Sequence, residues 1–103
     1  MGGLYLPDMN TAVQTLAEQV LPILRRYGVT RAGVFGSRAR GDSQVNSDLD
    51  ILVDLPEGSS LLDLVGLQLD LGDALGVTVD AHTYRSLHPL LRDRILAEEI
   101  RIL

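Results

Sequence analysis

The chain has 103 residues with a net charge of −5 at pH 7, and 46% of its residues are hydrophobic. This length fits one domain with one core, and the acidic balance argues against direct nucleic-acid binding, which depends on basic residues that neutralise phosphates. No apolar run approaches the roughly 18 residues of a membrane-spanning helix. The first ten residues show no secretory signal, so we expect a cytoplasmic protein with no membrane partner.

The spacing of apolar residues predicts the elements of the first half. Helical periodicity over residues 10–27 predicts a helix that ends before Gly28. A short apolar run over residues 31–35 predicts a strand, and alternation over residues 48–55 predicts a second one. About a dozen residues separate these two strands, which permits them to pair in antiparallel orientation.

The second half begins with a helix signal. Ser60 and Asp63 resemble a capping box, so we expect a helix from there to residue 75. Residues 77–83 predict a third strand, and residues 87–99 predict a final helix. A helix between the second and third strands permits a parallel crossover. We therefore predict a single domain over residues 1–103, an α/β fold with a small mixed sheet and helices packed mainly on one face.

Two carboxylates mark the second strand. Side chains alternate across a strand, so Asp48 and Asp50 point to one side while Leu49 and Ile51 point to the core. Two carboxylates this close repel each other by about 1 kcal/mol in water and about 4 kcal/mol at a protein-like dielectric. A cation between them would turn this repulsion into attraction.

The same alternation places Asp80 and His82 on one face of the third strand. If this strand neighbours the second, Asp80 approaches the pair Asp48 and Asp50. Three such carboxylates form an oxygen site suited to Mg²⁺ or Mn²⁺. We assign Asp80 to accept or direct the proton of the acceptor, whereas a lone histidine such as His82 is more often structural.

Gly36 and Ser37 lie where the first strand ends and a short helix or turn begins. Glycine lets the backbone approach phosphate closely, and the N–H groups at a helix start favour an anion. Arg38 and Arg40 bring positive charge to the same loop, where they could bind a triphosphate, although Arg40 could equally brace Asp42.

This combination of motifs resembles the polymerase β-like nucleotidyltransferase superfamily, in which Gly-Ser-x-x-x-Gly is followed by Asp-x-Asp and by a further Asp on a later strand. Residues 36–41 and 47–53 are similar to those of the minimal nucleotidyltransferases, the antitoxin partners of HEPN-domain ribonucleases. The resemblance covers about residues 11–103.

The resemblance implies the chemistry of the site and its partner. It implies a magnesium-dependent transfer of AMP from ATP to a tyrosine of a HEPN-type toxin. Asp48 and Asp50 would hold the metal, Asp80 would complete the triad, and Gly36 and Ser37 would contact the phosphates. Larger family members have a second domain that this chain lacks, so a partner protein is expected to supply the missing surface.

Two alternatives remain open beside this enzyme. The chain could be a binding antitoxin that neutralises its toxin by occlusion, or it could transfer a nucleotide to RNA or a small molecule. The helix over residues 61–71 is unusually apolar, so part of it fills the core or meets a partner. The charged residues near the C-terminus, among them Arg92, Glu98 and Glu99, are expected to form a solvated surface.

Overall fold

A computed structural model describes residues 11–41 and 47–103 of the chain. Its sheet has four strands in the order β3-β2-β1-β4. The strands β1 (Arg31–Phe35) and β2 (Leu49–Asp54) are antiparallel, and β3 (Val79–Thr83) is parallel to β2. The mixed sheet expected from the sequence is confirmed. A fourth strand, β4 (Ile100–Arg101), pairs antiparallel with β1 and was not expected.

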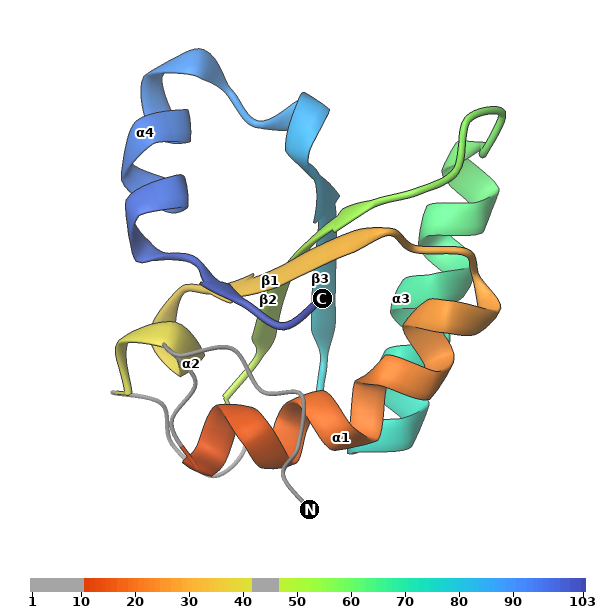
Figure 1. The fold of residues 1–103 in the computed structure, drawn as a ribbon, viewed down its shortest axis with the longest axis horizontal. Coiled ribbons are helices and arrows are strands. Elements are labelled where there is room, and N and C mark those ends of the chain that lie inside the picture. Colours follow the sequence, from red (N-terminus) through yellow and green to blue (C-terminus); the bar gives the residue numbers. More distant parts are fainter. Residues whose placement is uncertain (1–10, 42–46) are drawn as a thin grey trace.

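The helices cover the two faces of this sheet unequally (Figure 1). Helices α1 (Thr11–Arg26) and α3 (Leu61–Leu75) pack on one face, against the larger cluster of buried residues. The 3₁₀ helix η1 (Tyr84–Ser86) and helix α4 (Pro89–Glu98) lie over the smaller cluster on the other face. Packing mainly on one face is therefore confirmed.

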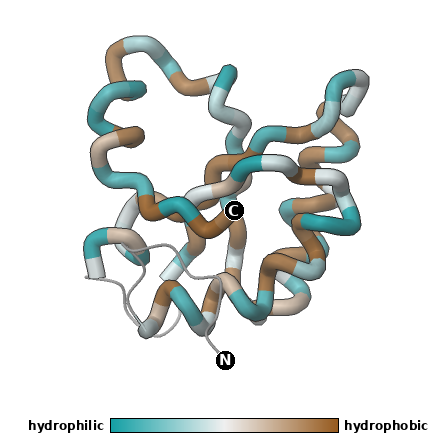
Figure 2. The backbone as a smooth tube through the Cα atoms, viewed as in Figure 1, coloured by the Kyte–Doolittle hydropathy of each residue, from teal (hydrophilic) through white to brown (hydrophobic). Residues whose placement is uncertain are grey.

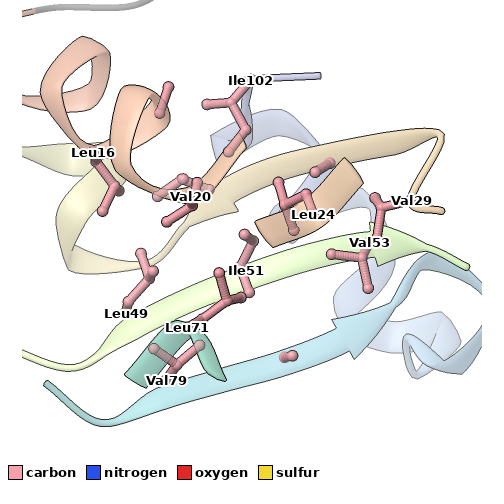
Figure 3. Packing of buried hydrophobic residues seen from close by; sticks show 14 of the residues in the cluster. Leu16, Val20, Leu24, Val29, Leu49, Ile51, Val53, Leu71, Val79 and Ile102 are labelled. Atoms are coloured by element: carbon pink, nitrogen blue, oxygen red, sulfur yellow. The ribbon is translucent and has the colours of Figure 1, made fainter. Parts of the chain in front are cut away.

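The larger core lies between α1, α3 and the inner face of the sheet (Figure 3). Leu24 of α1 and Ile51 of β2 are completely buried. Alternation along β2 and β3 places apolar side chains in this core and leaves the aspartates outside it. The labelled side chains in Figure 3 come from both layers: Leu16, Val20, Leu24, Val29, Leu49, Ile51, Val53, Leu71, Val79 and Ile102.

Helix α3 begins at the expected capping box, in which the Ser60 side chain accepts a hydrogen bond from the Asp63 N–H and the Asp63 carboxylate accepts one from the Ser60 N–H. Hydrophobic and hydrophilic residues alternate along the tube in this helix (Figure 2). Leu67 is fully buried, whereas Leu62 is 80% and Leu69 is 62% exposed. The apolar helix over residues 61–71 thus divides between the core and an exposed face.

Within the described part of the chain, no helix has the length and apolar character needed to span a membrane.

Candidate functional site

The direction of the strands brings the three aspartates to one edge of the sheet. Strands β2 and β3 are parallel, and their register pairs Asp50 with Asp80. Asp48 comes directly before β2 and is exposed, as is Asp80, while Asp50 is half-buried. Because β1 runs antiparallel to β2, its end at Phe35 lies opposite Asp50. The loop that follows β1 therefore starts beside the aspartates.

Gly36 lies directly against the Asp50 carboxylate. Its φ of 73° and ψ of −152° lie in a region that is essentially restricted to glycine. A Cβ atom at this position would collide with Asp50 Oδ2 and would lie 3.2 Å from Asp50 Cγ. The backbone of the loop and the Asp50 carboxylate thus occupy adjoining space, which only glycine permits.

The short helix α2 (Ser37–Arg40) begins directly after Gly36. The residue before it, Gly36, has no side chain that could cap it, and the helix ends at Gly41, whose φ is 79°. Ser37 is the first residue of the helix, so its hydroxyl lies at the helix start. The N–H groups at a helix start and a hydroxyl beside a glycine match the donors that phosphate oxygens require.

The two arginines of α2 have different contacts. Arg38 Nη2 donates a hydrogen bond to the Ser47 carbonyl at 2.7 Å and so braces the segment that leads into Asp48. Arg40 Nη1 lies 3.2 Å from Glu98 Oε1 and forms an ion pair with it. The alternative partner considered for Arg40, Asp42, lies outside the described residues.

The electrostatics of the site centre on Asp50. Burial raises the pKa of the Asp50 carboxyl, and the nearby Asp80 and Asp48 raise it further, while His82 and Arg40 lower it. His82 is exposed, and its ring centroid lies 6.0 Å from that of Phe35. The ionised form of Asp50 is therefore disfavoured in the folded chain until positive charge reaches it.

This shift predicts how stability depends on pH without metal. A carboxyl whose pKa is higher in the folded state destabilises the fold as pH rises above its unfolded value, and this cost is complete above the folded pKa. We therefore expect Asp50→Asn to raise the free energy of unfolding at neutral pH. The gain should vanish in acid, below the ordinary pKa of aspartate. Urea unfolding in the presence of EDTA, repeated between pH 3 and pH 8, measures both.

The donor set of the site suits a hard divalent cation. Asp48, Asp50 and Asp80 offer only carboxylate oxygens. Burial and then repulsion by the other aspartates raise the pKa of Asp50, and a cation would relieve the repulsion. Among residues 11–41 and 47–103, no three acidic, histidine or cysteine side chains are arranged as a complete metal site. Mg²⁺ commonly binds through one or two carboxylates together with substrate phosphates, so these residues fit such an ion.

The sequence predicted that Glu98 and Glu99 belong to a solvated surface near the C-terminus, and this prediction is wrong for both residues. Glu98 Oε1 accepts a hydrogen bond from the Gly36 N–H at 2.9 Å. Glu99 accepts one from the Tyr84 hydroxyl, and burial together with this carboxylate raises the pKa of Tyr84. Both glutamates thus make tertiary contacts, and Glu98 touches a residue of the candidate site. The alternation of Ile100, Arg101 and Ile102 was the sequence signal that could have indicated a strand here.

A hollow in the described surface lies at the opposite end of the sheet. It has a volume of about 770 Å³ and is lined by the turn after β2 and by residues of η1, among them Pro56, Ser60 and Tyr84. None of the aspartates 48, 50 and 80 lines it. We therefore identify the candidate site by its chemistry and its backbone geometry.

Comparison with known proteins agrees with this geometry. Residues 17–102 match the family model described as a nucleotidyltransferase domain. The chain is 50% identical over 91 residues to MJ0435 of Methanocaldococcus jannaschii, an inferred protein adenylyltransferase, and the match covers 88% of this chain and 98% of MJ0435. It is also similar to a solved structure of an inferred minimal nucleotidyltransferase, with 42% identity and a TM-score of 0.74, covering 95% of this chain and 98% of that one.

A more distant likeness concerns the fold alone. A toxin–antitoxin complex solved with AMP-PNP contains a chain that is 24% identical to this one, with a TM-score of 0.75. The match covers 84% of this chain and 72% of that one.

Proposed function

We propose that this chain, which belongs to the nucleotidyltransferase domain family and is an enzyme, transfers AMP from ATP to a hydroxyl group of a HEPN-type toxin. The observation that carries the proposal is that Gly36 lies against the Asp50 carboxylate at one edge of the sheet, where Asp50 pairs with Asp80. This places a candidate phosphate loop against acidic residues, the combination that nucleotidyl transfer needs. The name of MJ0435 supports a protein as the acceptor.

The reaction assigns a task to each group. The acceptor oxygen attacks the α-phosphorus of ATP, the bond from this phosphorus to the bridging oxygen breaks, and pyrophosphate leaves with that electron pair. The acceptor hydroxyl loses its proton, and we assign the exposed Asp80 carboxylate to accept or direct it. The Gly36 N–H is donated to Glu98, so the contribution of Gly36 is the close approach of the loop to the phosphates, which the Ser37 hydroxyl and the N–H groups at the start of α2 would hold.

Asp48 and Asp50, with Asp80 beside them, would hold Mg²⁺, or Mn²⁺ in its place. The ion would neutralise charge on the phosphates and lower the pKa of the attacking hydroxyl. Arg40 adds a positive charge from α2 near Asp50, and Arg38 keeps the segment before Asp48 in place.

The acceptor is proposed to be a second protein because Asp48 and Asp80 are exposed, so that a group on a partner could reach them. The likeness in fold to a chain of a toxin–antitoxin complex solved with AMP-PNP is consistent with a toxin as this partner. The exposed face of α3, formed by Leu61, Leu62, Val65 and Leu69, offers apolar area that a partner could bury.

The test is a transfer assay with a HEPN-type toxin encoded beside this chain. Purified chain is incubated with the toxin and with ATP labelled on its α-phosphate, with Mg²⁺ or with EDTA. We expect label on the toxin only with Mg²⁺, and a mass increase equal to one or more AMP groups. ATP labelled on the γ-phosphate should leave the toxin unlabelled, which separates nucleotidyl transfer from phosphorylation.

The exposed apolar face of α3 also supports a second candidate function, neutralisation of the toxin by binding alone. A stable complex that blocks the toxin, with no label under any metal condition, would favour this function over transfer. Label on RNA or on a small hydroxyl compound, and not on the toxin, would show that the chain transfers a nucleotide to another class of acceptor.

A further inference from the structure

Glu98 links the C-terminal helix to the candidate phosphate loop. One oxygen of its carboxylate, Oε1, accepts hydrogen bonds from the Gly36 N–H at 2.9 Å and from Arg40 Nη1 at 3.2 Å. The Glu98 side chain is only 23% exposed. A single side chain, distant in sequence, thus contacts both ends of the Gly36–Arg40 turn.

The sheet explains why Glu98 lies at this point. Strand β4 pairs with β1 so that Val34 faces Ile100. Continuing this antiparallel register by two residues brings position 98 opposite Gly36. Glu98 is the last residue of α4 and not part of the strand. Its side-chain carboxylate accepts the Gly36 N–H in place of the backbone carbonyl that a longer strand would offer.

The two contacts bear on the groups that would handle ATP. The first holds the Gly36 backbone, whose position is tied to Asp50 because a Cβ at Gly36 would overlap that carboxylate. The second holds the Arg40 guanidinium, whose side chain is 48% exposed, against the Glu98 carboxylate. A long arginine side chain that is already restrained loses less conformational entropy when a phosphate binds.

We propose that Glu98 is a positioning residue for the nucleotide site, which fixes the turn at Gly36 and directs the Arg40 guanidinium toward the phosphates. This role rests on the proposed function. Glu98 acts through Gly36 and Arg40 and takes no part in bond making.

Two substitutions at Glu98 separate geometry from charge. Glu98→Ala removes both hydrogen bonds, whereas Glu98→Gln keeps an oxygen that can accept them. Glu57→Ala and Glu57→Gln make the same changes at an exposed glutamate in the turn after β2 and serve as matched controls. Thermal unfolding of every variant confirms that each is folded at the temperature of the measurements.

The first measurement is hydrogen exchange of the Gly36 amide, followed by NMR in the absence of nucleotide. Hydrogen bonds to charged groups are strong enough that their loss speeds local exchange by about tenfold or more. We expect this increase in Glu98→Ala, a change of less than about threefold in Glu98→Gln, and none in the controls. An unchanged Gly36 rate in Glu98→Ala would overturn the proposal.

The second measurement is the Kd for AMP-PNP with Mg²⁺, determined by calorimetry. We expect Glu98→Ala to weaken binding by about tenfold and Glu98→Gln to stay within about threefold of the wild type. Faster Gly36 exchange with an unchanged Kd would make Glu98 merely structural, and tighter binding in Glu98→Ala would make it a competitor of phosphate; either result overturns the role. No binding by the wild type would instead refute the proposed function itself, and the role of Glu98 with it.

Discussion

Replacing Asp50 by asparagine is expected to lower the rate of AMP transfer about a thousandfold, which corresponds to about 4 kcal/mol of transition-state stabilisation. Asp50 is the half-buried carboxylate of the site, and it lies against Gly36 and beside Asp80. An amide keeps the shape of this side chain but removes the negative charge that would hold a cation at the phosphates. Single-turnover transfer of labelled AMP at saturating Mg²⁺ measures the effect.

Asp54→Asn provides the matched control for this experiment. Asp54 lies at the other end of the same strand, opposite Arg31, and is also half-buried. The same chemical change there should leave the transfer rate within about threefold of the wild type, since no candidate site residue is nearby. Equal losses in Asp50→Asn and Asp54→Asn would show that the strand, and not the site, had been damaged.

Stability gives an independent check on the same variant. Without metal, Asp50→Asn is expected to unfold at a higher urea concentration, because the carboxylate that it removes is disfavoured by burial and by Asp80. A variant that is more stable yet inactive cannot owe its inactivity to unfolding. Mg²⁺ should raise the thermal midpoint of the wild type and leave that of Asp50→Asn almost unchanged.

Local sequence patterns were sufficient to predict most of the sheet and the placement of the acidic residues. Alternation places Asp50 outside the core because Leu49 and Ile51 must be inside it, and the capping box at Ser60 sets the start of α3. These two features depend on residues that are close in sequence, so they can be read from the sequence alone. The helix between β2 and β3 permits parallel pairing but does not fix it, and the register that pairs Asp50 with Asp80 was known only from the structure.

The part that was missed depends on contacts between distant residues. Strand β4 has only two residues, too few for a periodic signal to show clearly. Without this strand, nothing in the sequence indicates that Glu98 lies opposite Gly36, and a charged residue near the end of a helix is usually solvated. The ion pair between Arg40 and Glu98 could not be predicted either, because it also depends on where Glu98 lies in the fold.

Gly36→Ala is expected to have the second large effect, because it acts on the backbone and on Asp50 together. The φ of 73° and ψ of −152° strain any residue with a side chain, which costs about 1 to 3 kcal/mol. The new methyl group would also push the Asp50 carboxylate out of its position. We expect a lower thermal midpoint and a loss of AMP transfer of about a hundredfold or more, since small displacements of catalytic groups have effects of this size.

Gly41→Ala separates the two causes. Gly41 ends the same short helix with a φ of 79°, so alanine is strained there as well, but a Cβ at Gly41 meets no atom of residues 11–41 and 47–103 within 4 Å. This variant should lose about 1 kcal/mol of stability and keep most of its transfer activity. If Gly36→Ala and Gly41→Ala lost activity in proportion to their stability, backbone strain would explain both. A much larger loss of activity in Gly36→Ala would show that the space beside Asp50 is what transfer requires.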